Sequence, residues 1–278
     1  MTLGLDYAGG RPAATAIKTA GYDFVVRYLS SGGPGLPGKL LLPEEADALR
    51  AADVDIVSNW ETFAARMLDG YAAGVYDATV ALAQVLACGG RSDRPIYFSA
   101  DFDATEAQQE PINDYLRGAA SVLGDANVGV YGGYWVCARA LDAGVARWAW
   151  QTDAWSGGQI DPRINLHQRI AQVNVDGVMC DVNEAMTSDY GQWSLTPETQ
   201  KGTDMADIEI LLGDIREQLA GQGSREPGQY TGWPQLGQNP DGSHRTLVDA
   251  VAAALEGIAE LRKAIDPLAA QHRDAAGK

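Results

Sequence analysis

Acidic side chains recur where predicted strands end, and they are the residues of this chain best suited to chemistry. The five candidates for catalysis are Asp6, Glu61, Asp101, Asp103 and Asp181. Two carboxyl groups across one cavity suit the cleavage of a glycosidic bond, because one stays protonated as an acid while the other stabilises positive charge at the sugar carbon. Carboxylates that cluster without such a use repel one another and cost stability. We therefore expect these residues to form an acidic catalytic site.

The segment ADFDA at residues 100–104 is the most specific of these signals. Residues two apart on a strand point to the same side, so Asp101 and Asp103 are both expected to face the cavity if the strand continues that far. The alternative is structural, because an aspartate after a strand commonly caps the following helix, as Asp103 could before Thr105 and Glu106. Residue types alone leave both interpretations open.

Aromatic and polar side chains at or just past the same strand ends are the candidates for substrate binding. They are Tyr7, Arg27, Tyr28, Trp60, Tyr131, Trp135, Gln151, Trp155, Gln168 and Asn183. Flat aromatic faces suit stacking on sugar rings, and the alternative is that most of the aromatic residues fill the core. No cofactor or metal is expected, because the chain has three histidines, three widely spaced cysteines and no loop with the oxygen ligands of a calcium site.

Apolar runs bounded by turn residues indicate the elements that must position these side chains. Eight strands are predicted near residues 3–6, 23–29, 54–60, 95–101, 127–131, 147–151, 164–168 and 175–181. Helical patterns lie between the earlier ones, at residues 12–20, 43–52, 69–88, 109–123 and 133–143. This alternation is typical of a parallel sheet. Eight strands without a glycine-rich phosphate loop after the first favour a closed (β/α)₈ barrel of the TIM type, with its site at the carboxyl ends of the strands and the last helices short or missing.

Composition excludes several classes of protein. The net charge of −16 has the wrong sign for a nucleic-acid binder, because phosphate binding depends on lysine and arginine. No segment of about 18 apolar residues could span a membrane, and the N-terminal residues show no Sec-type signal. Cys88, Cys137 and Cys180 are too widely spaced to indicate a disulfide framework, and are expected to be small buried residues.

The character of the chain changes after the last predicted strand. Residues 1–186 are expected to form the barrel, residues 187–245 a helix followed by a Gly-, Pro- and Gln-rich linker, and residues 246–278 an amphipathic helix. The helix before the linker has an apolar stripe of Met205, Ile208, Leu212, Ile215 and Leu219. The last helix repeats apolar residues in heptad spacing, at Leu247, Val251, Ala254, Ile258, Leu261 and Ile265. Its partner is either this chain itself or, through residues 246–265, a second copy or a virion protein.

Six segments together resemble a known family. They are GLDYAGGRP, YDFVVRYLS, PIYFSADFDA, VGVYGGYWVC, WQTDAW and VDGVMCDVNEA. Over residues 2–186 the chain is similar to the glycoside-hydrolase-like (β/α)₈ barrel domains of actinobacteria and their phages, which are related to the glycoside hydrolase family 25 lysozymes. The resemblance implies muramidase-type cleavage of peptidoglycan, with Asp6, Asp101, Asp103 and Asp181 at the positions of that family's acidic motif.

One position departs from the lysozyme pattern. Asp103 stands where the lysozymes have the glutamate that serves as general acid, and its side chain is one methylene shorter. Catalytic geometry tolerates little misplacement, so Glu61 is a second candidate for the acid. Activity therefore stays open, and the two hypotheses are a retaining or inverting cell-wall hydrolase and a barrel that binds cell-wall carbohydrate without cleaving it.

The C-terminal part, with its segment GWPQLG, also resembles the tails of some actinobacteriophage lysins and virion proteins. This resemblance implies an endolysin or virion-associated lysin, or, if the barrel is inactive, a structural protein of a phage tail or virion. It also implies delivery by the phage, either as a virion component or from the host cytoplasm to the wall through a holin.

Overall fold

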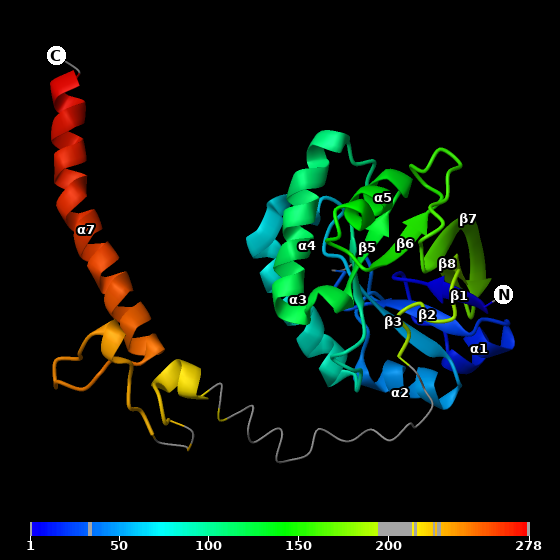
Figure 1. Ribbon diagram of the computed structural model, residues 1–278, viewed down its shortest axis with the longest axis horizontal. Helices are drawn as coiled ribbons and strands as arrows, with labels where there is room; N and C mark the ends of the chain where they lie inside the picture. The colour runs from blue at the N-terminus through cyan, green and yellow to red at the C-terminus, as the bar shows by residue number, and fades with distance from the viewer. Residues whose placement is uncertain are drawn as a thin grey trace. The chain divides into compact units, whose positions relative to one another are not determined.

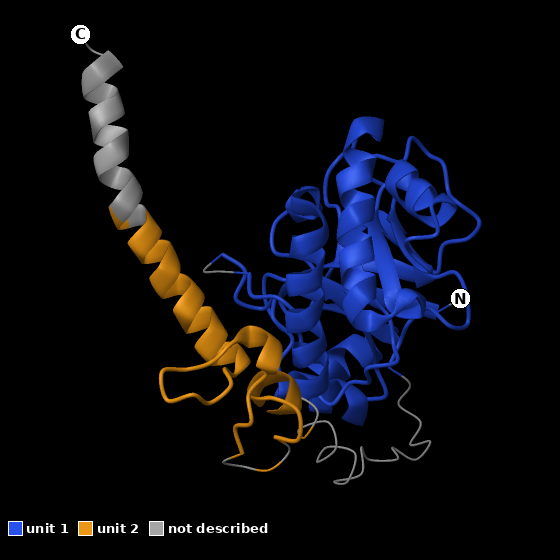
Figure 2. Ribbon diagram, turned by 60° about the vertical axis from the view of Figure 1, so that its left-hand side comes forward, with its two compact units in different colours: residues 1–196 blue, residues 197–278 orange. Residues whose placement is uncertain are grey.

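The computed structural model describes residues 2–32, 35–193, 213, 216–224, 226 and 229–276, with only the backbone at residues 262 and 264–276 (Figure 1). Contacts within the chain divide it into two units, residues 1–196 and residues 197–278 (Figure 2). The finer division predicted at residues 186 and 245 stays a prediction.

The first unit is a closed barrel in which eight strands are hydrogen-bonded in chain order. The strands are β1 (Thr2–Asp6), β2 (Phe24–Tyr28), β3 (Asp55–Trp60), β4 (Ile96–Ser99), β5 (Val128–Gly132), β6 (Trp148–Thr152), β7 (Leu166–Val175) and β8 (Val178–Ala185). The predicted α/β barrel is therefore confirmed.

Helices cover the outside of the first six strands (Figure 1). They are α1 (Ala14–Thr19), α2 (Pro43–Ala51), α3 (Gly70–Ala87), α4 (Gln109–Leu123) and α5 (Tyr134–Asp142), with short 3-10 turns η1 (Arg66–Asp69), η2 (Glu106–Gln108) and η3 (Asp125–Asn127). Pro43 opens α2, where its missing N–H costs nothing. Residues 153–165, between β6 and β7, contain no helix, in agreement with the expectation that the later helices are short or missing.

The direction of β8 corrects the prediction that all strands run parallel. β8 pairs antiparallel with both β7 and β1. Only Asp176 and Gly177 separate β7 from β8, and both have positive φ, at 51° and 80°. Such a two-residue turn makes a hairpin, whereas a parallel connection needs a dozen residues or more. Because β8 is reversed, Asp181 pairs with Asp6 from within the strand, and both side chains lie at the same end of the barrel.

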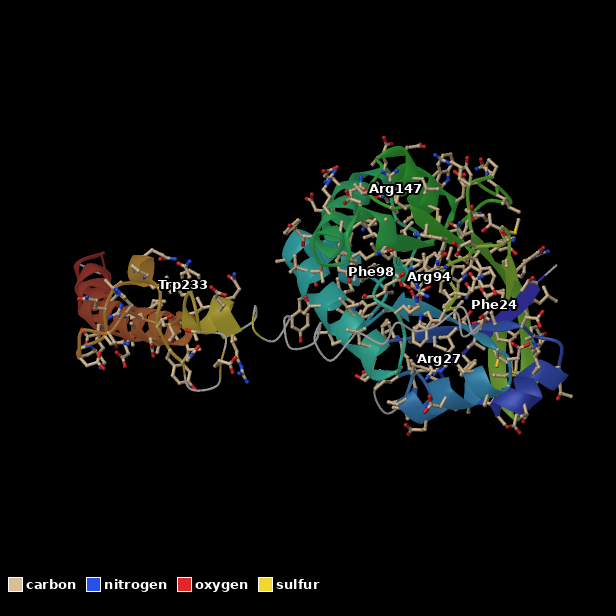
Figure 3. The ribbon with its side chains drawn as sticks, turned by 60° about the horizontal axis from the view of Figure 1, so that its bottom comes forward. Phe24, Arg27, Arg94, Phe98, Arg147 and Trp233 are labelled. Carbon is tan, nitrogen blue, oxygen red and sulfur yellow. The ribbon has the colours of Figure 1, made fainter. Side chains whose placement is uncertain are left out.

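Aromatic rings fill the inside of the barrel. Its interior cluster is made of Phe24, Val26, Val57, Tyr97, Tyr131, Trp150, Leu166 and Tyr190. Gly4 makes room for the ring of Phe24, because a Cβ at that position would lie 2.4 Å from it. Phe98 belongs instead to the layer between strands and helices, where its ring meets the edge of Tyr115 (Figure 3).

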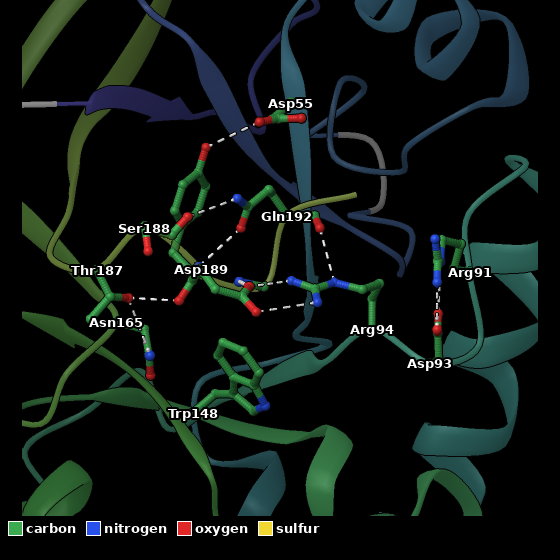
Figure 4. Close-up of polar contacts among 12 residues, drawn as sticks. Asp55, Arg91, Asp93, Arg94, Trp148, Asn165, Thr187, Ser188, Asp189 and Gln192 are labelled. Carbon is green, nitrogen blue, oxygen red and sulfur yellow. Dashed lines mark hydrogen bonds and ion pairs between the residues drawn. The ribbon is translucent and has the colours of Figure 1, made fainter. Parts of the chain in front are cut away.

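The end of the barrel opposite the carboxyl ends of the strands is closed by residues 187–193. Arg94, which precedes β4, donates to the carboxylate of Asp189 and to the carbonyl oxygen of Gln192 (Figure 4). Tyr190 donates to Asp55 at 3.3 Å and accepts, at its carbonyl oxygen, a hydrogen bond from Tyr97 at 2.9 Å. A cavity inside the barrel is therefore expected to open at the other end, where the carboxyl ends of the strands lie.

The second unit contains η4 (Pro234–Leu236) and α7 (Leu247–Ala276). Thr246 and Asp249 cap α7 reciprocally, since the carboxylate of Asp249 accepts from the Thr246 N–H at 3.0 Å and the Asp249 N–H donates to the Thr246 hydroxyl at 3.2 Å. Of the stripe predicted before the linker, Leu219 is described, whereas Met205, Ile208, Leu212 and Ile215 lie outside the described residues. Self-association through residues 246–265 stays a prediction. In the part of the chain that the structure describes, no helix is long and apolar enough to cross a membrane.

Candidate active site

A cavity of about 550 Å³ opens at the carboxyl ends of the barrel strands. Four of the five predicted catalytic carboxyl groups line it: Asp6, Glu61, Asp101 and Asp181. Asp6 and Asp181 come from the neighbouring strands β1 and β8, while Glu61 and Asp101 follow the neighbouring strands β3 and β4. In the closed barrel β2 alone separates these two pairs of strands on one side and three strands separate them on the other, so the four carboxyl groups form two pairs around one cavity.

Asp6 is held rigidly at the base of this cavity. Its Oδ2 accepts hydrogen bonds from the amides of Gln168 and Asn183, each at 2.8 Å, and its Oδ1 accepts one from the hydroxyl of Tyr28 at 3.2 Å. Burial, and next the negative charge of Asp181, raise the pKa of Asp6 to about 7, against the opposing effect of the hydrogen bonds. Near neutral pH this carboxyl group therefore exchanges its proton readily.

The raised pKa of Asp6 predicts a pH-dependent stability. The native state binds this proton more tightly than the unfolded chain, so the contribution is complete below pH 3.8 and is lost as pH rises through about 7. The loss amounts to about 4 kcal/mol over that window. Urea unfolding of the wild type and of Asp6→Asn at intervals between these pH values measures it: we expect their stabilities to converge as pH falls, and parallel curves would contradict the assignment.

Asp101 and Glu61 differ in their surroundings. Burial, and next the charge of Glu61, raise the pKa of Asp101, and its carboxylate accepts no hydrogen bond from the described residues. Glu61 forms an ion pair with Lys39 at 3.1 Å, and the lysine ammonium is almost fully buried. The raised pKa makes Asp101 the better candidate for a proton donor, whereas Glu61 is engaged in an ion pair.

The β7–β8 hairpin supplies a wall that the sequence analysis did not predict. A register shift between Gln168 and Gln172 makes the intervening residues of β7 bulge over the cavity. Asp153 fixes this bulge, because its carboxylate accepts from the Ile170 N–H at 3.1 Å and contacts the His167 ring at 2.7 Å. Gln172 donates to Asp181 at 2.9 Å and so orients that carboxylate.

Four of the predicted binding residues also line the cavity: Tyr28, Tyr131, Trp155 and Gln168. The hydroxyl of Tyr131 donates to Gln168 at 2.7 Å, and Gln168 in turn donates to Asp6, so these three form one chain of hydrogen bonds. Trp155 is 38% exposed and has a φ of 57°. A tryptophan in this left-handed conformation is strained, and such strain is concentrated at functional sites.

Four other predicted binding residues lie on the helix side of the barrel wall: Tyr7, Arg27, Trp60 and Gln151. Alternate residues of a strand point to opposite faces, so the neighbours that line the cavity, such as Asp6 and Tyr28, exclude them from it. Arg27 instead forms an ion pair with Glu45 of α2 at 2.8 Å (its place is labelled in Figure 3). Tyr7 and Arg27 thus hold α2 against the barrel, Gln151 holds the loop of residues 159–161, and none of the four lines the site.

Three further predicted site residues are also outside the cavity lining. Asp103 is exposed, because β4 ends at Ser99 and strand alternation does not continue to residue 103. It is not the helix cap either, since Thr105 and Gln108 form the capping box of η2. Trp135 is 48% exposed elsewhere on the surface. Asn183 is fully buried and acts through Asp6, to which it donates, while accepting from the Trp150 indole at 2.8 Å.

Several residues of the site were missed by the sequence analysis. They are Lys39, Ser99, Thr152, Arg169, Ile170, Ala171 and Gln172. Ser99 could have been found from alternation with Asp101, whereas the prediction that Gln151 faces the cavity excluded its neighbour Thr152. Lys39 comes from a loop and gives no comparable signal.

A closed α/β barrel with paired carboxyl groups at the carboxyl ends of its strands is an architecture suited to the hydrolysis of glycosidic bonds. The model of the family described as "Rv2525c-like, glycoside hydrolase-like domain" matches residues 15–185, and the chain belongs to this family. A separate model, "Rv3766 C-terminal domain", matches residues 203–261. The family resemblance inferred for the barrel is thus confirmed.

Individual proteins agree with this assignment. The chain is 34% identical over 200 residues to a Mycobacterium tuberculosis protein named "Putative peptidoglycan hydrolase Rv2525c". The aligned region covers 68% of this chain and 83% of that protein. The crystal structure of the Tat-secreted protein Rv2525c from Mycobacterium tuberculosis, in complex with L-tartrate, is 33% identical, has a TM-score of 0.67 and covers 69% of this chain and 99% of that one. The crystal structure of an uncharacterized B. stearothermophilus protein shares the fold at 18% identity and a TM-score of 0.50, over 66% of this chain and 96% of that one.

Proposed function

We propose that the protein hydrolyses the glycan strands of bacterial cell wall, with peptidoglycan as substrate. The observation that carries the proposal is the meeting of Asp6, Glu61, Asp101 and Asp181 in one cavity, as two pairs from two separate pairs of neighbouring strands. Family membership and the name of the relative that is 34% identical support the same reaction and substrate.

Asp101 is the proposed proton donor. It lines the cavity, its pKa is raised by burial and by Glu61, and the described residues occupy neither of its oxygens. A protonated Asp101 gives its proton to the glycosidic oxygen as the bond from that oxygen to the sugar carbon breaks. Glu61 is less suited to the same role, because the Lys39 ammonium engages its Oε1 at 3.1 Å.

The pair of Asp6 and Asp181 is proposed to stabilise the positive charge that develops on the sugar carbon. Both side chains line the same cavity as Asp101, and Gln172 and Asn183 fix their orientation. In the completed reaction water supplies a hydroxyl group to the sugar carbon, and its proton restores the acid. The stereochemistry of the product distinguishes a covalent intermediate, which retains the configuration, from direct attack by water, which inverts it.

Trp155 is proposed to stack on a sugar ring at the mouth of the cavity. For Trp155→Ala we expect KM to rise about tenfold with kcat little changed, because stacking binds the ground state and the transition state alike. Steady-state kinetics on solubilised cell-wall glycan measure the two constants. A loss confined to kcat would contradict the role of a binding platform.

The proposed function is tested by release of dye from labelled, purified peptidoglycan. The wild type is expected to solubilise the dye, and Asp6→Asn, Asp101→Asn and Asp181→Asn are expected to lose this activity while keeping a cooperative unfolding transition. Release by the wild type that survives in all three variants would contradict the assigned site.

A second candidate function is binding of cell-wall carbohydrate without cleavage. The observation that favours it is the exposed position of Asp103, the residue that stands in place of the lysozymes' general acid. This candidate predicts saturable retention of the protein by purified wall, with no soluble product. Failure of the wild type to bind any wall fraction would contradict it.

Delivery by a phage, as an endolysin, virion-associated lysin or tail protein, stays a proposal. Its support is the resemblance of the C-terminal part of the sequence to the tails of phage lysins and virion proteins. The family model that matches residues 203–261 describes a C-terminal domain and names no role for it. The proposed partner surface is residues 246–265, and the proposed location is the cell wall.

A further inference from the structure

A second cavity, of about 500 Å³, lies outside the barrel wall between the end of β3 and α3. We call it the flank groove and define it by Ser31, Trp60, Thr62, Phe63, Tyr76 and Asp77. Phe63 is 53% exposed and Tyr76 is 64% exposed, so two aromatic rings face solvent at one groove. Aromatic faces of this kind offer apolar area at low entropic cost, which suits them to binding flat apolar surfaces.

The flank groove and the active-site cavity share a wall. Trp60 lines the groove, while the next residue, Glu61, lines the cavity. Ser30 also lines the groove and its hydroxyl donates to the carbonyl oxygen of Glu61. A ligand in the groove would therefore contact the residue that precedes Glu61, a carboxyl residue of the active-site cavity.

The groove has unused capacity for hydrogen bonding. The indole nitrogen of Trp60 is buried and has no partner among the described residues. The hydroxyls of Ser31, Thr62 and Tyr76 likewise form no hydrogen bond within the part of the chain that is described. A buried N–H without a partner costs stability, and exposed hydroxyls beside aromatic rings suit a ligand that carries several hydroxyl or amide groups.

Charge in the groove is internally balanced. Arg66 donates to both carboxylate oxygens of Asp77, at 2.7 and 2.9 Å, and the same carboxylate accepts from Tyr115 at 2.6 Å. The groove thus offers no unpaired cation to the carboxylates of a peptide stem and no unpaired anion to an amine. Its chemistry favours a neutral, polyhydroxylated ligand with an apolar face.

We propose that the flank groove binds a saccharide unit of the same glycan chain whose scissile bond lies in the active-site cavity. The inference deepens the proposed function and rests on it. Its ground is the combination of the shared wall at residues 60–61, the two exposed aromatic rings and the neutral set of polar groups. Binding at two places along one chain makes a long glycan a better ligand than a short one.

The test compares the affinities of a short and a long oligomer. In the Asp101→Asn background, calorimetry is used with the disaccharide and the hexasaccharide of N-acetylglucosamine as probes. We expect the hexasaccharide to bind about tenfold more tightly, and Phe63→Ala combined with Tyr76→Ala to remove this gain without changing the affinity for the disaccharide. Tyr71→Ala is the matched control, because Tyr71 is a 52% exposed aromatic residue of α3 outside the groove.

Equal affinity for both oligomers would contradict saccharide binding in the flank groove. A gain in affinity for the hexasaccharide that persists in the double variant would contradict it as well. The proposed function is read separately, from the release of reducing ends by the wild type. If the wild type releases reducing ends but the hexasaccharide gains no affinity from the groove, only the proposed saccharide site is contradicted. A groove-dependent gain without release overturns hydrolysis and leaves the saccharide site standing.

Discussion

Replacing Asp101 by asparagine is expected to lower kcat on peptidoglycan by about 10²–10⁴-fold, the usual contribution of a general acid. Asparagine keeps the shape of the side chain and removes the transferable proton. Asp101 lines the cavity, and burial, and next the charge of Glu61, raise the pKa of its carboxyl group, which favours retention of that proton. The measurement is the initial rate of reducing-end release, with unfolding curves to show that the variant is folded.

Asp103→Asn is the matched control for this change. It makes the same substitution two residues away, on an exposed side chain outside the cavity lining. We expect its rate to stay within a factor of about two of the wild type, as for surface substitutions remote from the reacting groups. The reverse result, with Asp103→Asn inactive and Asp101→Asn active, would return the role of acid to the position that the lysozyme pattern indicates.

Arg27→Met is expected to lower the free energy of unfolding by about 3–5 kcal/mol, because it removes the buried partner of Glu45 and several buried hydrogen bonds, and leaves Glu45 with the more exposed Arg11 as its cation. Arg27 is fully buried and forms an ion pair with Glu45 at 2.8 Å, and its guanidinium also donates to the carbonyl oxygens of Tyr7 and Gly38. Because α2 is attached to the barrel through these contacts, the loss appears as a shift of the denaturation midpoint.

Arg117→Met is the control for Arg27. Arg117 pairs with Glu110 and Asp114 on the surface of α4, and its side chain is 44% exposed. Exposed pairs contribute about 0–1 kcal/mol, so this variant is expected to unfold almost as the wild type does. Comparable losses in the two variants would show that burial of Arg27 adds nothing to the strength of its pairing.

The fold could be predicted from the sequence because the spacing of apolar residues and the turn residues are local signals. The helices predicted at residues 43–52 and 109–123 were found at Pro43–Ala51 and Gln109–Leu123. The reversal of β8 was missed, although Asp176 and Gly177 are a typical hairpin pair. The expectation of repeated parallel units outweighed that turn signal, and the length of β7 was underestimated for the same reason.

The site was predicted less completely, and strand alternation explains much of the difference. Asp6 with Tyr7, and Arg27 with Tyr28, are neighbours on one strand and so cannot both face the cavity. Applying that rule leaves Asp6 and Tyr28 inside, as the structure places them. Lys39 beside Glu61 could not be found in this way, because the loop that carries it has no period and the contact spans 22 residues of sequence.

The central claim, that this barrel hydrolyses cell-wall glycan, is tested most directly by identifying the new chain ends. Purified peptidoglycan is digested with the wild type, reduced with borodeuteride and analysed by mass spectrometry. We expect deuterated sugar alcohols that increase with time and with enzyme concentration, and that are absent with Asp101→Asn. Peptidoglycan that gains no new reducing ends, although it retains the protein, would contradict hydrolysis and identify the barrel as a carbohydrate-binding domain.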